Sequence, residues 1–369
     1  MRVQNSKIWT SLASRPFHHR TGWCDSCSGL SSALAMPDRR LVLAAVAAAS
    51  LASCRGGCAR NAADTKGSEP TADATDSRLA LIPAEAGMVT IVDVAKLRDA
   101  PILTNLVRGK ATDIQEVAAM MVSAEAGLRD YAKESGFHPI RDVDTVILAT
   151  AAGEQAGGGA VIRGRHLDEK RLVASIRKLK GKDGELIASK HGAHTLWSPR
   201  AQASVAAIVL DDRTLLVGSR DWTERMADLA DGVGSGRSAA TNADLVRLLR
   251  TVSGHAIAGV SLEPKHLSFL DRSDAGAGAA ADVRHATCSV DAGQRFSVAA
   301  NVELTSPAAA TSAARRWTEK LKDPKLAAMV RVRAEGSKFL LDADIDQERL
   351  RMLVLLGAMF ASFPLVHVD

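Results

Sequence analysis

Apolar residues fall into short groups that recur along the chain from about residue 79. The stretches 88–94 (MVTIVDV) and 145–150 (TVILAT) are rich in β-branched residues, which predicts two strands. Between them, apolar residues recur every three or four positions from 112 to 135, and Gly136 follows. This spacing predicts an amphipathic helix that ends at Gly136 and turns its apolar side to a core, with a ligand groove as the alternative.

A second pattern repeats after residue 145, in which two short strands joined by a polar or glycine-rich turn are followed by an amphipathic helix. Asp, Asn and Gly are favoured in such turns because they adopt the required backbone conformations. The predicted strand pairs are 146–149 with 160–163, 206–210 with 214–218, 284–290 with 295–302, and 329–333 with 338–343. The helices are predicted around 172–179, 221–229, 310–321 and 350–353.

Helix start signals support these assignments. Ser306 precedes Pro307, and a proline is well tolerated at the first position of a helix. Asn242 is expected to cap a helix that contains Leu245. Asp221 and Glu224 have the spacing of a capping box, which predicts a helix that begins there.

The two halves of the apolar pattern correspond. MVTIVDVAKL (88–97) matches HAIAGVSLEPKHL (255–267), each is followed by two strand-pair and helix units, and a Gly/Ser break lies at 232–238. We therefore expect an α+β fold of antiparallel sheets with helices packed on one face, duplicated in two lobes, 79–236 and 237–369. The predicted helix at 112–135 has no counterpart in the second lobe.

The amino-terminal part has the pattern of an export signal. Arg39 and Arg40 precede an uncharged run of about a dozen residues, which is shorter than the ~20 residues of a membrane-spanning helix. Leu51-Ala52-Ser53-Cys54 follows and resembles the lipobox of bacterial lipoproteins. The resemblance makes 36–53 a signal peptide and implies cleavage between Ser53 and Cys54, with lipid attached to Cys54.

The segments on either side of the predicted signal peptide have no pattern of buried residues. Residues 1–35 lack a helix or strand period, and we expect them to be an upstream extension from a mis-assigned start, with translation beginning at Met36. Residues 54–78 are mainly Gly, Ala, Asp, Thr, Ser and Pro, which predicts a flexible tether between the lipid and the folded part.

Composition and charge fit a globular protein and argue against nucleic-acid binding. Apolar residues make up 46% and charged residues 24% of the chain, and the formal net charge is +5. Residues 1–53 contain six of the 47 basic and two of the 42 acidic side chains, so 41 basic and 40 acidic side chains remain after Ser53. A nearly neutral mature chain does not provide the basic surface that phosphate backbones require.

The five cysteines leave their chemistry open. Cys24 and Cys27, near His18-His19, have half the spacing of a zinc site, but no scaffold for four ligands is evident. Both would be lost on cleavage, and Cys54 would carry lipid. Cys58 and Cys288 could form a disulfide in an exported protein or remain two free thiols.

Other candidate sites have simpler structural interpretations. His191 and His194 could share a metal, but no third acidic ligand is close in sequence, so an exposed strand connection is the alternative. The stretch 153–159 is glycine-rich without the order of a phosphate-binding loop, which favours a hairpin. Paired acids and tryptophans are expected in solvated turns and in the core, respectively. These residues are Asp142, Asp144, Asp211, Asp212, Trp197 and Trp222.

The stretches GFHPIRDVDTVILAT (136–150) and GRHLDEKRL (164–172) resemble exported lipoproteins that are abundant in myxobacteria. The resemblance implies strand–helix repeats and a lipid-anchored protein in the periplasm. Arg55 after the lipidated cysteine favours the outer membrane, with the inner membrane as the alternative. Because no nucleophile–base set is evident, we expect non-catalytic binding of an envelope protein or component, without cofactor. The alternatives are a receptor with a small ligand between the lobes and, less favoured, a hydrolase.

Overall fold

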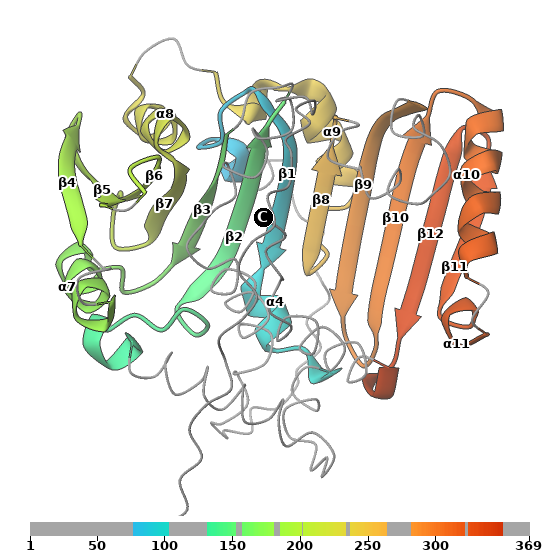
Figure 1. Cartoon of the computed structure of the whole chain (residues 1–369), viewed down its shortest axis with the longest axis horizontal. Coiled ribbons are helices and arrows are strands. Elements are labelled where there is room, and N and C mark those ends of the chain that lie inside the picture. The colour runs from blue at the N-terminus through green and yellow to red at the C-terminus, as the bar shows by residue number, and fades with distance from the viewer. Residues whose placement is uncertain are drawn as a thin grey trace, which may run out of the picture.

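The strands of the protein form one antiparallel sheet (Figure 1). In the described residues this sheet has twelve strands in the order β11-β12-β10-β9-β8-β1-β2-β3-β7-β6-β5-β4. The computed structural model describes residues 77–102, 131–152, 157–180, 185–200, 202–233, 237–263, 282–321 and 324–349.

The strands occur in two sets along the chain, which we call the first half and the second half of the sheet. The first half contains β1 (Ala86–Asp93), β2 (Val143–Ala151), β3 (Gly158–Gly164), β4 (Leu186–His191), β5 (His194–Pro199), β6 (Val205–Val209) and β7 (Thr214–Ser219). The second half contains β8 (Ile257–Ser261), β9 (Val283–Ala292), β10 (Phe296–Leu304), β11 (Val330–Glu335) and β12 (Lys338–Ile345).

Six short or medium helices and one 3-10 turn connect the described strands. They are α4 (Val94–Arg98), α7 (Glu169–Lys180), α8 (Arg220–Asp231), η3 (Ala239–Thr241), α9 (Ala243–Thr251), α10 (Pro307–Lys320) and α11 (Pro324–Ala327). The mixed helix and strand class and the antiparallel pairing are therefore confirmed. Of the predicted helix at 112–135, only 131–135 lie within the described residues; they are helical, and Gly136 follows with a positive φ of 71°.

The structure contains the strands predicted from the sequence and one further hairpin. Every predicted strand overlaps an observed one, including the four predicted pairs. The hairpin of β4 and β5 was not predicted, because its sequences LIASKH and HTLWSP mix polar and apolar residues without a strict period. The two halves meet where β1 pairs with β8, for example Val89 with Val260.

The side chains of each strand alternate between two faces of the sheet. We call the side of Ile147 and Ser289 face A, and the side of Val146 and Cys288 face B. The register carries these assignments from strand to strand, because directly paired residues lie on the same face. In the first half both faces are apolar, so Ile147 and its neighbour Val146 belong to two different hydrophobic clusters.

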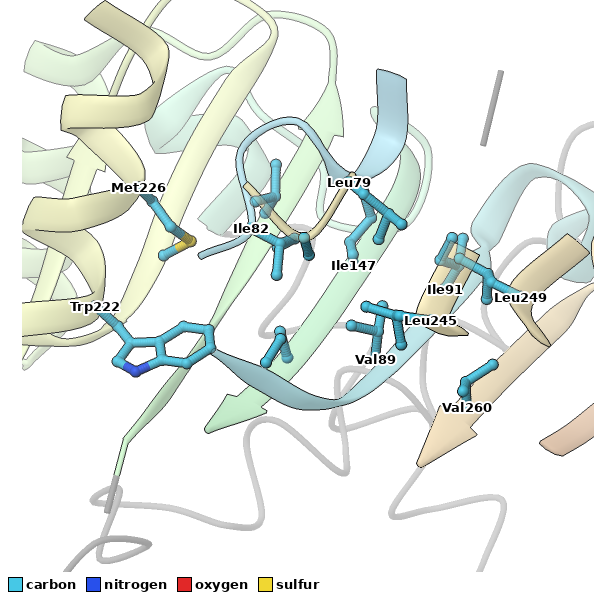
Figure 2. Packing of buried hydrophobic residues seen from close by; sticks show 14 of the residues in the cluster. Leu79, Ile82, Val89, Ile91, Ile147, Trp222, Met226, Leu245, Leu249 and Val260 are labelled. Carbon is cyan, nitrogen blue, oxygen red and sulfur yellow. The ribbon is translucent and has the colours of Figure 1, made fainter. Parts of the chain in front are cut away.

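Helices cover face A and face B, so the expectation that they pack on one face is wrong. α8 and α9 cover face A of the first half, where Trp222, Met226, Leu245 and Leu249 pack on Val89 and Ile147 (Figure 2). Face B is covered by α4 and α7 in the first half and by α10 in the second half. The physical reason is that strands such as TVILA and GAVI carry consecutive apolar residues, which require cover on two sides.

Glycines allow close packing between α8 and the sheet and between the strands β3 and β7. A Cβ atom on Gly159 would lie 2.8 Å from the Met226 methyl carbon, and one on Gly218 would lie 2.5 Å from the Gly158 carbonyl oxygen. The glycine-rich stretch at 153–159 joins β2 to β3, as the hairpin interpretation predicted, and its described end also makes room for the core.

The helix start signals were correct in two cases and wrong in one. The Asn242 side chain accepts a hydrogen bond from the Leu245 backbone N–H at 3.1 Å, and Ser306 accepts one from Ala309 at 3.2 Å. Asp221 does not cap α8, because that helix already begins at Arg220 with Ser219 at its N-cap position. Arg220 instead pairs with Glu224, at 2.9 Å between Nε and Oε1.

Candidate functional site

A polar hollow of about 440 Å³ lies on face A of the second half. Its floor consists of small side chains on two adjacent strands, Ser289 on β9 and Ser297 and Ala299 on β10. A longer, charged side chain lies beside each of the two β10 residues. Asp291 on β9 is paired with Ser297, and Asp342 on β12 is paired with Ala299. The surface is therefore depressed where small side chains are surrounded by large ones.

Exposure separates this region from the rest of face A. Ser297 and Ala299 are exposed, whereas Ile147 and Val161 on the same face of the first half are completely buried. The boundary is α9, whose Leu245 packs with the strands of the first half and β8. The hollow begins just beyond this helix, at His255 and β9.

The acidic groups of the hollow each have a basic partner in the protein. His255 Nδ1 lies 2.6 Å from an Asp291 carboxylate oxygen. Arg295 Nε donates to Asp344 at 2.6 Å. Arg333, just outside the hollow, donates to Asp342.

Arg333 is held in place from two sides. It donates to Glu335 at 2.8 Å as well as to Asp342. These hydrogen bonds to Glu335 and Asp342 raise the pKa of the Arg333 guanidinium, so this group stays charged. Asp342 thus has a charged partner on the neighbouring strand β11, which it shares with Glu335.

Arg331 differs from the other charged groups of the hollow. It is exposed on β11, directly across from Asp342 in the register. Within the described part of the chain, its side chain makes no hydrogen bond and no ion pair. The hollow therefore offers one unpaired guanidinium, two serine hydroxyls and three carboxylates that already have partners.

The groups of the hollow can bind a ligand through hydrogen bonds and charge. Neither Ser289 nor Ser297 hydrogen-bonds to His255 among the described residues, so no serine is coupled to a base there. Across the described ranges, no three His, Cys, Asp or Glu side chains gather as a metal site would require.

His191 and His194 lie on either side of the hairpin turn between β4 and β5. His191 Nε2 is 2.7 Å from an Asp228 carboxylate oxygen, and His194 Nε2 is 2.9 Å from one of Asp231. The sequence showed no acidic neighbour because both aspartates come from α8, 37 residues away. The two pairs fasten the hairpin to the last turn of α8, as expected for a strand connection.

Two of the four acids singled out in the sequence accept hydrogen bonds from backbone N–H groups close in the chain. Asp142 accepts from the His138 backbone N–H at 2.7 Å, and Asp211 accepts from that of Arg213 at 2.7 Å. Asp144 lies 3.7 Å from Arg165 Nη2. Asp212 lies in the turn between β6 and β7, where its carbonyl oxygen accepts from the Leu167 N–H at 3.0 Å.

The two candidate tryptophans differ in their surroundings. Trp222 is 1% exposed and belongs to the core, as predicted. Trp197 is half-buried: its Nε1 donates to Glu169 at 2.6 Å, and the Arg177 guanidinium carbon lies 5.7 Å from its ring centre.

The predicted lipidation site lies outside the described residues, together with Cys24, Cys27 and Cys58. This applies to Leu51, Ala52, Ser53 and Cys54. Cys288 is a free thiol on β9. Burial raises its pKa, which keeps the thiol protonated and unreactive. No helix in the described ranges is long and apolar enough to cross a membrane.

Sequence reasoning missed the hollow, although one signal for it exists. In β10 (FSVAANVEL) and β11 (VRVRAE) apolar and polar residues alternate, whereas β2 and β3 carry consecutive apolar residues. Alternation predicts one covered and one open face. Which polar residues meet on that open face depends on the strand register.

Comparison with known proteins gives little further guidance. No known protein family matches the chain, and no curated protein matches it. Among solved structures, crystal form I of TP0453 is 11% identical with a TM-score of 0.41, covering 76% of this chain and 96% of that one. Crystal form III of TP0453 is 10% identical with a TM-score of 0.42, covering 75% and 96%. These values are too low to assign a shared fold or function to the chain.

Proposed function

We propose that this protein is a lipid-anchored, periplasm-facing binding protein of the outer membrane, and that the hollow on face A binds a polar envelope component or partner. The observation that supports binding is the exposed floor at Ser297 and Ala299 of β10, which charged residues surround, on a sheet face that helices cover elsewhere. The support for the anchor is the lipobox at Leu51–Cys54 and the tether composition after it.

The lining of the hollow favours a polar group over an apolar metabolite. Small-molecule pockets have volumes of roughly 300–1,000 Å³ and mostly apolar walls. The hollow has a suitable volume, about 440 Å³, but aspartates, arginines and serines line it. All its lining residues lie between His255 and Asp344, so it belongs to the second half rather than to a crevice between the halves.

We also propose that the two halves arose by internal duplication. β1, β2 and β3 follow one another across the sheet as β8, β9 and β10 do. α7 follows β3 and α10 follows β10, and both helices lie on face B. The pairs β6–β7 and β11–β12 then occupy corresponding places, with β4 and β5 added in the first half.

The proposal is tested on full-length protein expressed with its leader and extracted from membranes. Its amino-terminal mass should show an acylated Cys54, and an unlipidated chain beginning at Met1 would contradict the anchor. The extracted protein is then screened by thermal shift against soluble envelope fragments, that is, peptides, amino sugars and oligosaccharides. We expect at least one of them to raise the melting temperature, because a ligand that binds only the folded state stabilises it.

Two tryptophan variants connect such a response to the hollow. Ser297→Trp fills the exposed floor and should abolish the response, whereas Val233→Trp, at an exposed position outside the hollow, should retain it. A response that persists in Ser297→Trp, or no response to any fragment, would contradict binding in the hollow. Turnover of a fragment by the wild-type protein would favour the hydrolase alternative.

A further inference from the structure

The hollow has an unequal distribution of unpaired charge. Asp291, Asp342 and Asp344 each contact a basic side chain, from His255, Arg333 and Arg295, respectively. Arg331 is the charged lining residue whose side chain forms no hydrogen bond or ion pair with any described residue. An incoming group at Arg331 thus meets a free guanidinium rather than one already engaged.

The position of Arg331 directs its side chain over the floor. Ser289, Ala299, Asp342 and Arg331 occupy one row across β9, β10, β12 and β11, on the same face. Arg331 is at the outer end of this row, and the small side chains of Ser289 and Ala299 leave the inner part open. A ligand can therefore rest on the floor while one end reaches the guanidinium.

We propose that Arg331 anchors a carboxylate of the ligand, so that the hollow recognises a polar molecule with a free carboxyl end, such as a peptide carboxyl terminus. This inference rests on the proposed binding function of the hollow. A guanidinium binds a planar carboxylate through two parallel hydrogen bonds, which gives both strength and orientation. The exposed Ser297 hydroxyl is suited to an amide group of the ligand behind that carboxylate.

The neighbouring acids explain why a carboxylate fits better than a phosphate. Asp342 and Asp344 line the same hollow as Arg331. Each has a partner, and Arg331 is the one unpaired cation described in the hollow, so the hollow can balance one negative charge, whereas the second charge of a phosphate would face the carboxylates. A single negative charge gains the guanidinium contact with less repulsion.

The test compares two peptides on the full-length protein by isothermal titration at low salt. The first is N-acetyl-trialanine with a free carboxylate, and the second is its carboxyl-terminal amide. We expect the acid to bind about tenfold more tightly, the size of effect that a charge-assisted hydrogen-bonded pair produces. Inorganic phosphate at the same concentration should not displace the acid.

Variants of Arg331 identify the anchor. Arg331→Gln should reduce the affinity for the acid to that for the amide, and Arg331→Lys should keep part of the preference. Arg315→Gln, at an exposed position on α10, serves as the control and should bind like the wild type. Circular dichroism confirms that each variant is folded.

Equal binding of acid and amide would overturn the carboxylate anchor. If Ser297→Trp still abolished the binding of both peptides, the hollow would remain the binding site, and only the role of Arg331 as a carboxylate anchor would be wrong. Failure of both peptides to bind, or a preference for the acid that survives in Arg331→Gln, would also overturn the inference.

Discussion

Face A has two different surfaces on one continuous sheet. In the first half Ile147, Val161 and Leu216 are completely buried beneath α8 and α9. In the second half Ser297, Ala299 and Asp291 are exposed, and the aspartates of this face pair with histidine or arginine side chains from turns and from β11. The same backbone arrangement therefore supports a core in one half and a candidate binding surface in the other.

The difference follows from which residues occupy alternate strand positions. An apolar position on face A contributes stability only if a helix removes it from water. A polar position needs no cover, because its groups bind water or each other. Exposed ion pairs such as Arg295–Asp344 contribute little stability, about 0–1 kcal/mol each. The second half keeps its apolar packing on face B, where α10 lies.

The largest change in stability is expected when the same polar side chain is placed on the covered part and on the open part of face A. Ala149 on β2 is 2% exposed, whereas Ala299 on β10 is exposed on the same face. Ala149→Asn should lower the free energy of unfolding by roughly 2–5 kcal/mol, because it overpacks the core and buries an amide without a partner. Ala299→Asn should change it by no more than about 0.5 kcal/mol.

Chemical denaturation of both variants measures this difference. Equal losses of stability would show that face A is covered in the second half as well, and the comparison would fail. A large loss in Ala149→Asn alone would support two distinct surfaces.

A smaller effect is expected from the close packing of strands below α8. A methyl group on Gly218 would lie 2.5 Å from the Gly158 carbonyl oxygen, so Gly218→Ala should cost about 1–3 kcal/mol. The control is Gly293→Ala in the turn between β9 and β10, where no atom lies within 4 Å of the added carbon. Thermal unfolding of the two variants should therefore differ, and equal melting temperatures would contradict the tight packing of the first half.

The smallest effect concerns His285, which lies on face A where the two surfaces meet. Burial lowers the pKa of His285 below its ordinary value of 6.5. The folded protein therefore holds the neutral form, and the unfolded chain binds more protons at this site as the pH falls below 6.5. The nearby charges come from Glu303 on β10, Lys338 on β12, and Asp244 and Arg247 on α9.

The sign of the pH effect follows from this shift. At pH 7.5 His285 is neutral in the folded and the unfolded protein and does not change the free energy of unfolding. As the pH falls toward 5.5, protonation of His285 in the unfolded chain should lower that free energy. His285→Gln cannot take up a proton, so its free energy of unfolding should decrease less over the same range. Denaturation of wild type and variant at both pH values measures the contribution of His285 alone. The His–Asp pairs of His191, His194 and His255 are present in both proteins and cancel in the difference. An equal decrease in both proteins would show that His285 is not buried at the boundary.

Much of the local structure could be predicted because its causes are local. Asn242 and Ser306 cap their helices through side-chain contacts three residues away. The turns at Asp211-Asp212 and Glu335-Gly336 were predicted from residues that adopt turn conformations. The error at Asp221 has a local cause too, since capping-box spacing alone does not fix the residue at which a helix begins.

The candidate site could not be predicted in the same way. His255 and Asp291 are 36 residues apart in sequence, and Arg295 and Asp344 are 49 apart, yet each pair is in contact. Such contacts depend on how β8 to β12 are ordered and registered. A shift of one residue in any strand would turn its polar residues to face B and remove the hollow.

Local sequence patterns account for the strands other than β4 and β5, for most helix starts, for the turns and for the expected export signal, because propensity, spacing and short motifs act over a few residues. Consecutive apolar residues in β2 and β3 also required cover on both faces, although this was not predicted. The tertiary arrangement, in contrast, placed both halves in one sheet and ended the covered part of face A at α9. It also left Arg331 beside a floor of small residues, because strand pairing joins positions that are distant along the chain.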